Sequence, residues 1–134
     1  MRRVLLLSLF LSVPIRCFAD PVYVEEIQGI INKIHLQPSW RSIDVDKNDP
    51  GNITLSYKSD PGNLAVVQAD TRHILIDVLQ GLVKEGHNPS KEWISLFVFG
   101  QQDGLTTVTG QPGVRAFGDS YYDYNLDKIT WQNI

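Results

Sequence analysis

The residues best suited to recognition chemistry lie together near the C-terminal end of the sequence. They are three tyrosines and three aspartates: Asp119, Tyr121, Tyr122, Asp123, Tyr124 and Asp127. Tyrosine combines a rigid ring with a polar hydroxyl, and a carboxylate accepts hydrogen bonds in fixed directions. The cluster predicts a surface that binds a basic protein or a glycan. The alternative is a terminal strand whose tyrosines cover one edge of the core while its aspartates face water.

The same segment offers an enzymatic alternative, a small hydrolase of cell-wall or extracellular material. Asp119 and Asp123 would share one strand face with their Cα atoms roughly 13 Å apart, whereas the carboxyl groups of glycosidases lie about 5 to 9.5 Å apart. Gly118-Asp119-Ser120 is similar to the Gly-Asp-Ser motif of a serine esterase family, but all three histidines precede this serine. We therefore expect a protein that is not an enzyme, and we keep the hydrolase as the alternative.

A second group of acidic residues has part of a calcium-binding pattern. Asp44, Asp46 and Asn48 have the spacing that opens an EF-hand loop. That loop needs glycine at its sixth position and glutamate at its twelfth, where this chain has Asp49 and Leu55. The histidines also lack the spacing of zinc ligands. We expect no metal site and no cofactor, and we interpret the acidic stretch as a hairpin turn with local side-chain hydrogen bonds.

The N-terminus has the layout of a secretory signal peptide. Arg2 and Arg3 precede an apolar run at residues 4–13, and residues 17–19 (Cys-Phe-Ala) offer a cleavage site before Asp20. An apolar helix of that length reaches only about half-way through a bilayer core. The sequence therefore predicts a signal peptide at residues 1–19 and a single mature domain at residues 20–134, located in the periplasm or secreted.

Cleavage would leave an acidic chain without cysteine. It would remove three of the 12 basic residues and none of the 15 acidic ones, so nine against 15 give a formal net charge of −6. An acidic protein without a basic patch repels phosphates, which argues against nucleic acids and anionic membrane surfaces as partners. The only cysteine, Cys17, would leave with the signal peptide, and the neighbouring Arg16 disfavours its lipidation. We expect neither a disulfide nor a stable membrane anchor.

Hydrophobic periodicity predicts an α+β fold for the mature chain. It indicates helices at residues 22–36 and 64–85, a hairpin of residues 40–45 and 53–57, and strands at residues 93–99, 106–109, 114–124 and 128–131. A turn is expected at residues 101–104. The economical arrangement is one antiparallel sheet of about five strands with both helices packed on one face.

Two of these strands bear on function. Residues 93–99 (WISLFVF) are apolar on both faces apart from Ser95. This profile predicts a central strand that is covered on both sides, or one whose second face meets a partner, including a second copy of the chain. In the strand at residues 114–124, Gly118 predicts a bulge. Alternation should divide its side chains into two sets, Asp119, Tyr121 and Asp123 against Ser120, Tyr122 and Tyr124.

Together these patterns predict an exported, non-enzymatic binding module. Its expected partner is an envelope or extracellular protein, with a glycan as the second choice. An inhibitor or an accessory protein would both fit this description. The expectation rests on the acidic charge, the two-faced apolar strand and the Tyr/Asp cluster.

Overall fold

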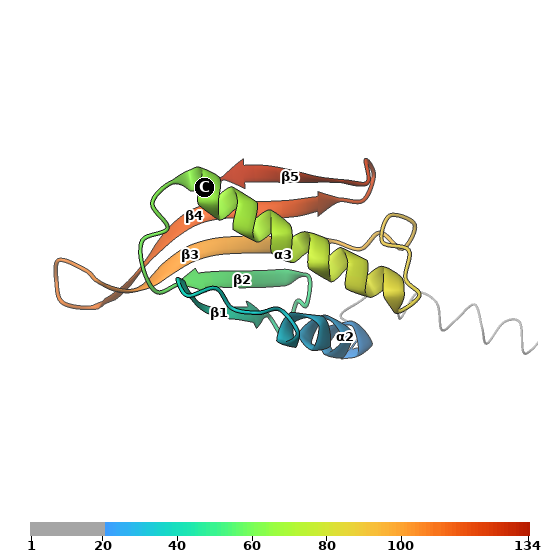
Figure 1. The fold of residues 1–134 in the computed structure, drawn as a ribbon, viewed down its shortest axis with the longest axis horizontal. Helices are drawn as coiled ribbons and strands as arrows, with labels where there is room; N and C mark the ends of the chain where they lie inside the picture. The colour runs from blue at the N-terminus through green and yellow to red at the C-terminus, as the bar shows by residue number, and fades with distance from the viewer. Residues whose placement is uncertain (1–20) are drawn as a thin grey trace, which may run out of the picture.

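The computed structural model describes residues 21–134 and confirms the α+β fold (Figure 1). The elements are, in chain order, α2 (Pro21–Asn32), β1 (Trp40–Val45), β2 (Asn52–Tyr57), α3 (Leu64–Lys84), β3 (Leu96–Thr106), β4 (Pro112–Asp123) and β5 (Lys128–Asn133). The predicted signal peptide lies outside the described residues. Within them, no helix is long and apolar enough to cross a membrane.

The five strands form one mixed sheet in the order β1-β2-β3-β4-β5. The expectation of a wholly antiparallel sheet is wrong for one pair, because β2 and β3 run parallel while the other neighbours are antiparallel. The reason is the connection between them. A parallel pair needs a long crossover, and α3 supplies it by carrying the chain back along the sheet before β3 begins (Figure 1).

Both helices pack on one face of the sheet, as predicted. Figure 1 shows α3 lying diagonally across the strands and α2 beside it near β1. Between helices and sheet lies a single core that includes Ile27, Ile31, Ile53, Leu55, Val67, Ile74, Leu75, Val78, Leu82, Leu96 and Val98. The apolar periodicity of α3 explains this arrangement, since its buried residues fall on one stripe of the helix.

Individual residues define the ends of α3 and its contact with α2. The side chain of Asn63 caps α3 by accepting a hydrogen bond from the backbone N–H of Val66. Gly86 follows the helix with a φ of +95°, the left-handed conformation that commonly ends a helix. Gly81 lies against Ile30 of α2, so closely that an added Cβ would stand 2.6 Å from the Ile30 Cδ1 atom. A glycine inside α3 thus lets the two helices approach each other.

The limits of β3 and the start of β4 differ from those predicted from the sequence. Strand β3 begins at Leu96 rather than Trp93, and it runs through the predicted turn at residues 101–104 to Thr106. The turn residues are absorbed as an irregularity in the ladder between Gln102 and Leu105, where Gly104 has a φ of +74°. The predicted strand at residues 106–109 is therefore the tip of the β3–β4 hairpin. The bulge predicted at Gly118 is confirmed by the register shift opposite Gly100 and Gln101.

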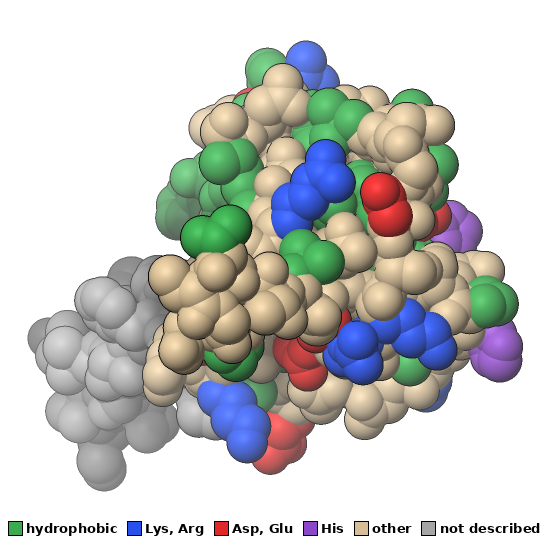
Figure 2. Space-filling model, turned by 90° about the vertical axis from the view of Figure 1, so that its left-hand side faces the viewer, with side chains coloured by type: hydrophobic (Ala, Val, Ile, Leu, Met, Phe, Trp, Pro, Cys, Tyr) green, Lys and Arg blue, Asp and Glu red, His purple; other side chains and the backbone are tan. Residues whose placement is uncertain are grey.

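The tip of this hairpin projects at one end of the molecule. The side chains seen at that end are mixed, with acidic and basic groups interspersed among polar and apolar ones (Figure 2). An ion pair between Arg41 Nε and Asp103 Oδ1, 2.5 Å apart, joins β1 to the base of the hairpin. This end therefore presents no block of a single charge in the view of Figure 2.

Candidate functional site

The face of the sheet opposite the helices is the candidate site. Strand β3 sends Leu96 and Val98 into the core and Phe97 and Phe99 to the other side, where both are only half-buried. Both helices of the described chain lie on the core side (Figure 1). Of the two interpretations of the apolar strand, the described residues thus fit the one in which the second face is left uncovered.

A shallow hollow of about 400 Å³ lies on this open face. It is lined by Asn52, Ile53, Thr54, Phe97, Phe99 and Asp119. The register explains why they meet: Thr54 lies beside Phe99 in the parallel β2–β3 pair, and Asp119 lies opposite Phe99 in the antiparallel β3–β4 pair. The two rings of β3 thus form the centre of the hollow, with polar residues of β2 on one side and Asp119 of β4 on the other. We call this the open-face hollow.

Asp119 is the unusual group in the open-face hollow. Its Oδ1 atom is buried and has no hydrogen-bond partner among the described residues. Gln132 of β5 lies beside it in the ladder, and its side chain hydrogen bonds to the carboxylate. Burial raises the pKa of Asp119 above its usual range, and the Gln132 hydrogen bond offsets part of that rise. The carboxylate therefore lacks one donor that the fold itself does not supply.

An aromatic strip continues from the open-face hollow onto β4. The rings of Phe97 and Tyr121 are stacked, with 5.8 Å between centroids and 27° between planes. Since Phe97 and Tyr121 are opposite each other in the ladder, the pair also stabilises the β3–β4 register. Together with Phe99, these rings offer flat apolar area next to the carboxylate of Asp119.

The charged side chains at the ladder positions of the open face are mostly carboxylates. Alternation along β1 and β4 places Asp44 and Asp123 on the same side as Asp119, at the positions beside Thr54 and Lys128. Lys128 is opposite Asp123 at the start of β5. Three carboxylates thus share this face with one ladder-paired lysine, so the face suits a cationic group better than an anionic one.

The structure divides the predicted Tyr/Asp cluster as the strand alternation requires. Asp119, Tyr121 and Asp123 lie on the open face. Tyr122 is 5% exposed in the core, where its hydroxyl donates to the carboxylate of Asp127. Tyr124 packs against the core and is half-buried. Burial and the Asp127 carboxylate raise the pKa of Tyr122 to about 12, so this hydroxyl stays a donor and holds the β4–β5 turn.

Ser120 points into the core. Its side chain is 2% exposed, and its Oγ lies 2.7 Å from Oγ1 of Thr71 on α3. Thr71 in turn donates to the backbone carbonyl of Val67. This arrangement ties β4 to α3. The serine version of the hydrolase alternative would need a Ser120 that substrate can reach, which this placement does not offer.

The acidic hairpin turn between β1 and β2 forms local hydrogen bonds, as interpreted from the sequence. The backbone N–H of Asn48 donates to Asp46, and the Asn52 side chain donates to Asp49. Within residues 21–134, no group of three or more His, Cys, Asp and Glu side chains is arranged to hold a metal ion.

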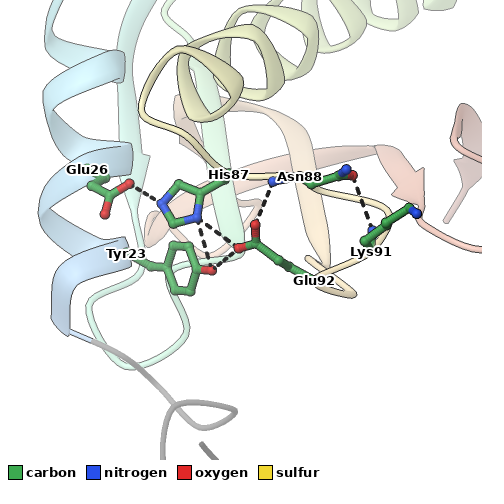
Figure 3. A network of polar contacts seen from close by, with 6 residues as sticks. All are labelled: Tyr23, Glu26, His87, Asn88, Lys91 and Glu92. Atoms are coloured by element: carbon green, nitrogen blue, oxygen red, sulfur yellow. Dashed lines mark hydrogen bonds and ion pairs between the residues drawn. The ribbon is translucent and has the colours of Figure 1, made fainter.

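A second polar cluster joins α2 to the segment between α3 and β3 (Figure 3). His87 lies between two carboxylates, with Nε2 2.6 Å from Glu26 of α2 and Nδ1 2.8 Å from Glu92. The hydroxyl of Tyr23, also on α2, donates to Glu92. The backbone N–H of Asn88 donates to the same carboxylate. These contacts fasten α2 to the segment between α3 and β3.

The environment of His87 shifts its protonation. Burial alone lowers its pKa, but the hydrogen bonds and charges of Glu92 and Glu26 outweigh burial, so the pKa is raised above 6.5. Burial raises the pKa of Glu92, but the hydrogen bonds from the Asn88 N–H, His87 and Tyr23 and the charge of His87 outweigh burial. The pKa of Glu92 is therefore lowered. This cluster could not be predicted from the sequence pattern, because His87 is more than 60 residues from its partners on α2.

Comparison of the chain with protein-family models, with curated proteins and with solved structures finds no significant match. The geometry of the open face and the chemistry of its side chains therefore carry the functional argument.

Proposed function

We propose that this protein is an exported, non-enzymatic binding module that recognises an envelope or extracellular protein through the open face of its sheet. The observation that carries the proposal is the open-face hollow, in which an uncovered aromatic strip lies beside the Asp119 carboxylate, one oxygen of which is buried without a partner among the described residues. Export is supported by the signal-peptide layout of residues 1–19.

The unbound hollow carries two free-energy costs that a partner would remove. A buried acceptor without a partner costs about 1–3 kcal/mol, and more when it is charged. Folded proteins satisfy nearly all such groups, so an exception calls for a reason. Phe97 and Phe99 add apolar surface whose exposure to water is unfavourable. A partner that brings a donor to Asp119 and covers both rings would remove both penalties at once.

The neighbouring polar groups strengthen the contrast. Asp70 accepts from the indole of Trp40 at 3.2 Å and from the hydroxyl of Tyr57 at 2.8 Å. Ser120 and Thr71 satisfy each other under α3. The fold thus provides partners for the polar side chains that face its core. Asp119 lines the open-face hollow on the side away from the helices, and its buried Oδ1 has no partner among the described residues.

The test is affinity capture from the organism's own cell envelope with residues 20–134 as bait. We expect a protein that wild type captures and that the double variant Phe97→Thr/Phe99→Thr loses. Threonine keeps the β-propensity of the strand while it removes the rings. The control variant is Val83→Thr/Val108→Thr, which changes two exposed residues on α3 and at the hairpin tip.

The outcome is decisive only with folded variants, which circular dichroism and thermal unfolding establish. Loss of the partner in the Phe97/Phe99 variant and retention in the control would support the open face as the binding surface. Equal capture by both variants would contradict it. Because Tyr122 is part of the core, alanine there would test folding and not binding.

A further inference from the structure

We infer that the open-face hollow receives an arginine side chain of the protein partner, with the guanidinium group between the Asp119 carboxylate and the aromatic strip. This inference rests on the proposed function and adds the chemistry of recognition to it. It begins from the missing donor at Asp119 Oδ1 and from the rings beside it.

The carboxylate selects the charge of the occupant. Gln132 hydrogen bonds to the carboxylate of Asp119, whose Oδ1 is buried and has no donor among the described residues. Because Asp119 lines the open-face hollow, an occupant of the hollow can bring an N–H or O–H donor to this carboxylate. A donor that also carries positive charge makes a shorter and stronger hydrogen bond to a carboxylate than a neutral donor does. Asp44 and Asp123 lie on the same face and add negative potential around it.

The aromatic strip selects the shape of the cation. Phe99 lies directly opposite Asp119, and Phe97 stacks on Tyr121 one step along the ladder. A guanidinium group is planar and weakly hydrated, so it can lie on a ring and donate in its own plane to an adjacent carboxylate. A lysine ammonium is a more strongly hydrated point charge, which favours arginine over lysine here. The chain itself uses this stacking elsewhere, since Arg115 lies over Phe117 at 5.1 Å from the ring centroid.

The size and charge of the face argue against the other occupants. A hollow of about 400 Å³ that is open on one side suits one long side chain better than a folded element. A second copy of this chain would bring Asp44, Asp119 and Asp123 towards the same three carboxylates, which repel each other. A glycan would stack on the rings but would leave the negative potential without a counter-charge.

The first experiment uses peptides as probes. The protein of residues 20–134, labelled with ¹⁵N, is titrated with end-blocked Gly-Gly-X-Gly-Gly peptides in which X is arginine, lysine or citrulline. Citrulline has nearly the shape of arginine but carries no charge. We expect saturable amide shifts around Asn52, Phe97, Phe99 and Asp119 with the arginine peptide, at an affinity in the millimolar range. The lysine peptide should bind several-fold more weakly, and the citrulline peptide at least tenfold more weakly.

Matched variants tie the effect to one carboxylate. Asp119→Asn keeps the shape of the side chain and should weaken arginine binding at least tenfold, whereas Asp77→Asn on α3 should leave it unchanged. Equal binding of the arginine and citrulline peptides, equal binding by Asp119→Asn and wild type, or shifts outside the open-face hollow would overturn the inference.

Capture experiments separate this inference from the proposed function. Loss of the protein partner in both Asp119→Asn and Phe97→Thr/Phe99→Thr supports the two together. Loss only in Phe97→Thr/Phe99→Thr keeps the binding surface and overturns the arginine contact. A homodimer in light scattering that the ring variant dissociates, or a captured glycan, would overturn both by naming another occupant of the face.

Discussion

Two neighbouring residues of β4, Asp119 and Ser120, show how differently polar groups are hydrogen-bonded on the two faces of the sheet. Ser120 points to the helices and meets Thr71 at 2.7 Å, where it is 2% exposed. Asp119 points away from the helices, and its buried Oδ1 has no partner among residues 21–134. On the core side the fold satisfies its own polar groups. On the open face, an aromatic strip and this acceptor lie side by side with no helix of the described residues over them.

Apolar side chains follow the same division. Leu96 and Val98 are completely buried under the helices, whereas Phe97 and Phe99 between them are half-buried. Under the proposed function, one face of the strand contributes to stability and the other to recognition. If this division is correct, substitutions at adjacent positions should have separable effects on folding and on binding.

The largest contrast is expected between Leu96→Ala and Phe97→Ala. Leu96 is 0% exposed, so its truncation removes core contacts and leaves a cavity, which costs about 2–5 kcal/mol of unfolding free energy. Phe97 is half-buried on an uncovered face, and its truncation should cost no more than about 1.5 kcal/mol. Urea unfolding followed by circular dichroism measures both values. A loss for Phe97→Ala as large as that for Leu96→Ala would mean that the open face is also essential to the fold.

The second contrast uses the polar neighbours. Ser120→Ala removes the partner of a buried threonine hydroxyl and should reduce the unfolding free energy by about 1–2 kcal/mol. Asp119→Asn should have the opposite sign at neutral pH. The pKa of Asp119 is raised in the folded state, so the folded protein binds this proton more tightly, and its ionisation destabilises the fold as pH rises.

The pH dependence makes this contrast testable. The Asp119→Asn variant should be at least as stable as wild type at pH 7, and any advantage should disappear below the ordinary pKa of an aspartate, about 3.9. Ser120→Ala should lose stability by a similar amount at both pH values. Thermal unfolding at pH 3 and pH 7 measures both variants. An Asp119→Asn protein that is less stable than wild type at pH 7 would show that the fold itself uses this carboxylate.

A third contrast concerns two helical glycines. Gly81→Ala places a Cβ within 2.6 Å of Ile30 Cδ1, whereas Gly29→Ala on α2 meets nothing within 4 Å. Alanine gains about 1 kcal/mol over glycine inside a helix, and overpacking costs about 1–3 kcal/mol. We expect Gly29→Ala to stabilise the protein by up to about 1 kcal/mol and Gly81→Ala to destabilise it by about the same amount. Equal stabilisation by both would mean that α2 can move away from α3 at no cost.

Local and periodic features of this fold could be predicted from the sequence. The period of residues 64–85 predicts α3 to within one residue, and alternation predicts the hairpin and the two sides of β4. The parallel β2–β3 pair could not be predicted in this way, because it depends on which edge of β2 the chain reaches after α3. The turn at residues 101–104 was misplaced since a bulge at Gly104 uses the same residue types as a turn.

The candidate site divides along the same line. The uncovered Phe97 and Phe99 follow from a strand that is apolar on both faces, and Asp119 follows from alternation. That one oxygen of Asp119 lacks a donor depends on the neighbours that three strands bring together. The His87 cluster was missed because α2 and the segment after α3 meet only in the folded chain.

The smallest effect on unfolding free energy is expected at His87, whose ring nitrogens both have hydrogen-bond partners within the fold. Its pKa is raised in the folded state, so its stabilising contribution is fully present below the unfolded value, about 6.5, and is lost as pH rises through the folded value. Between pH 6 and pH 9, wild type should therefore lose on the order of 1 kcal/mol of unfolding free energy that His87→Gln does not lose. NMR titration of the His87 ring should give a pKa above 6.5, and Glu26→Gln should lower it.

His87 and Glu26 join α2 to the segment after α3, and neither lines the open-face hollow. Arginine-peptide binding should therefore be unaffected by either variant. A change in that binding would show that the two regions are coupled and that the division between a self-sufficient side and a recognition side is incomplete.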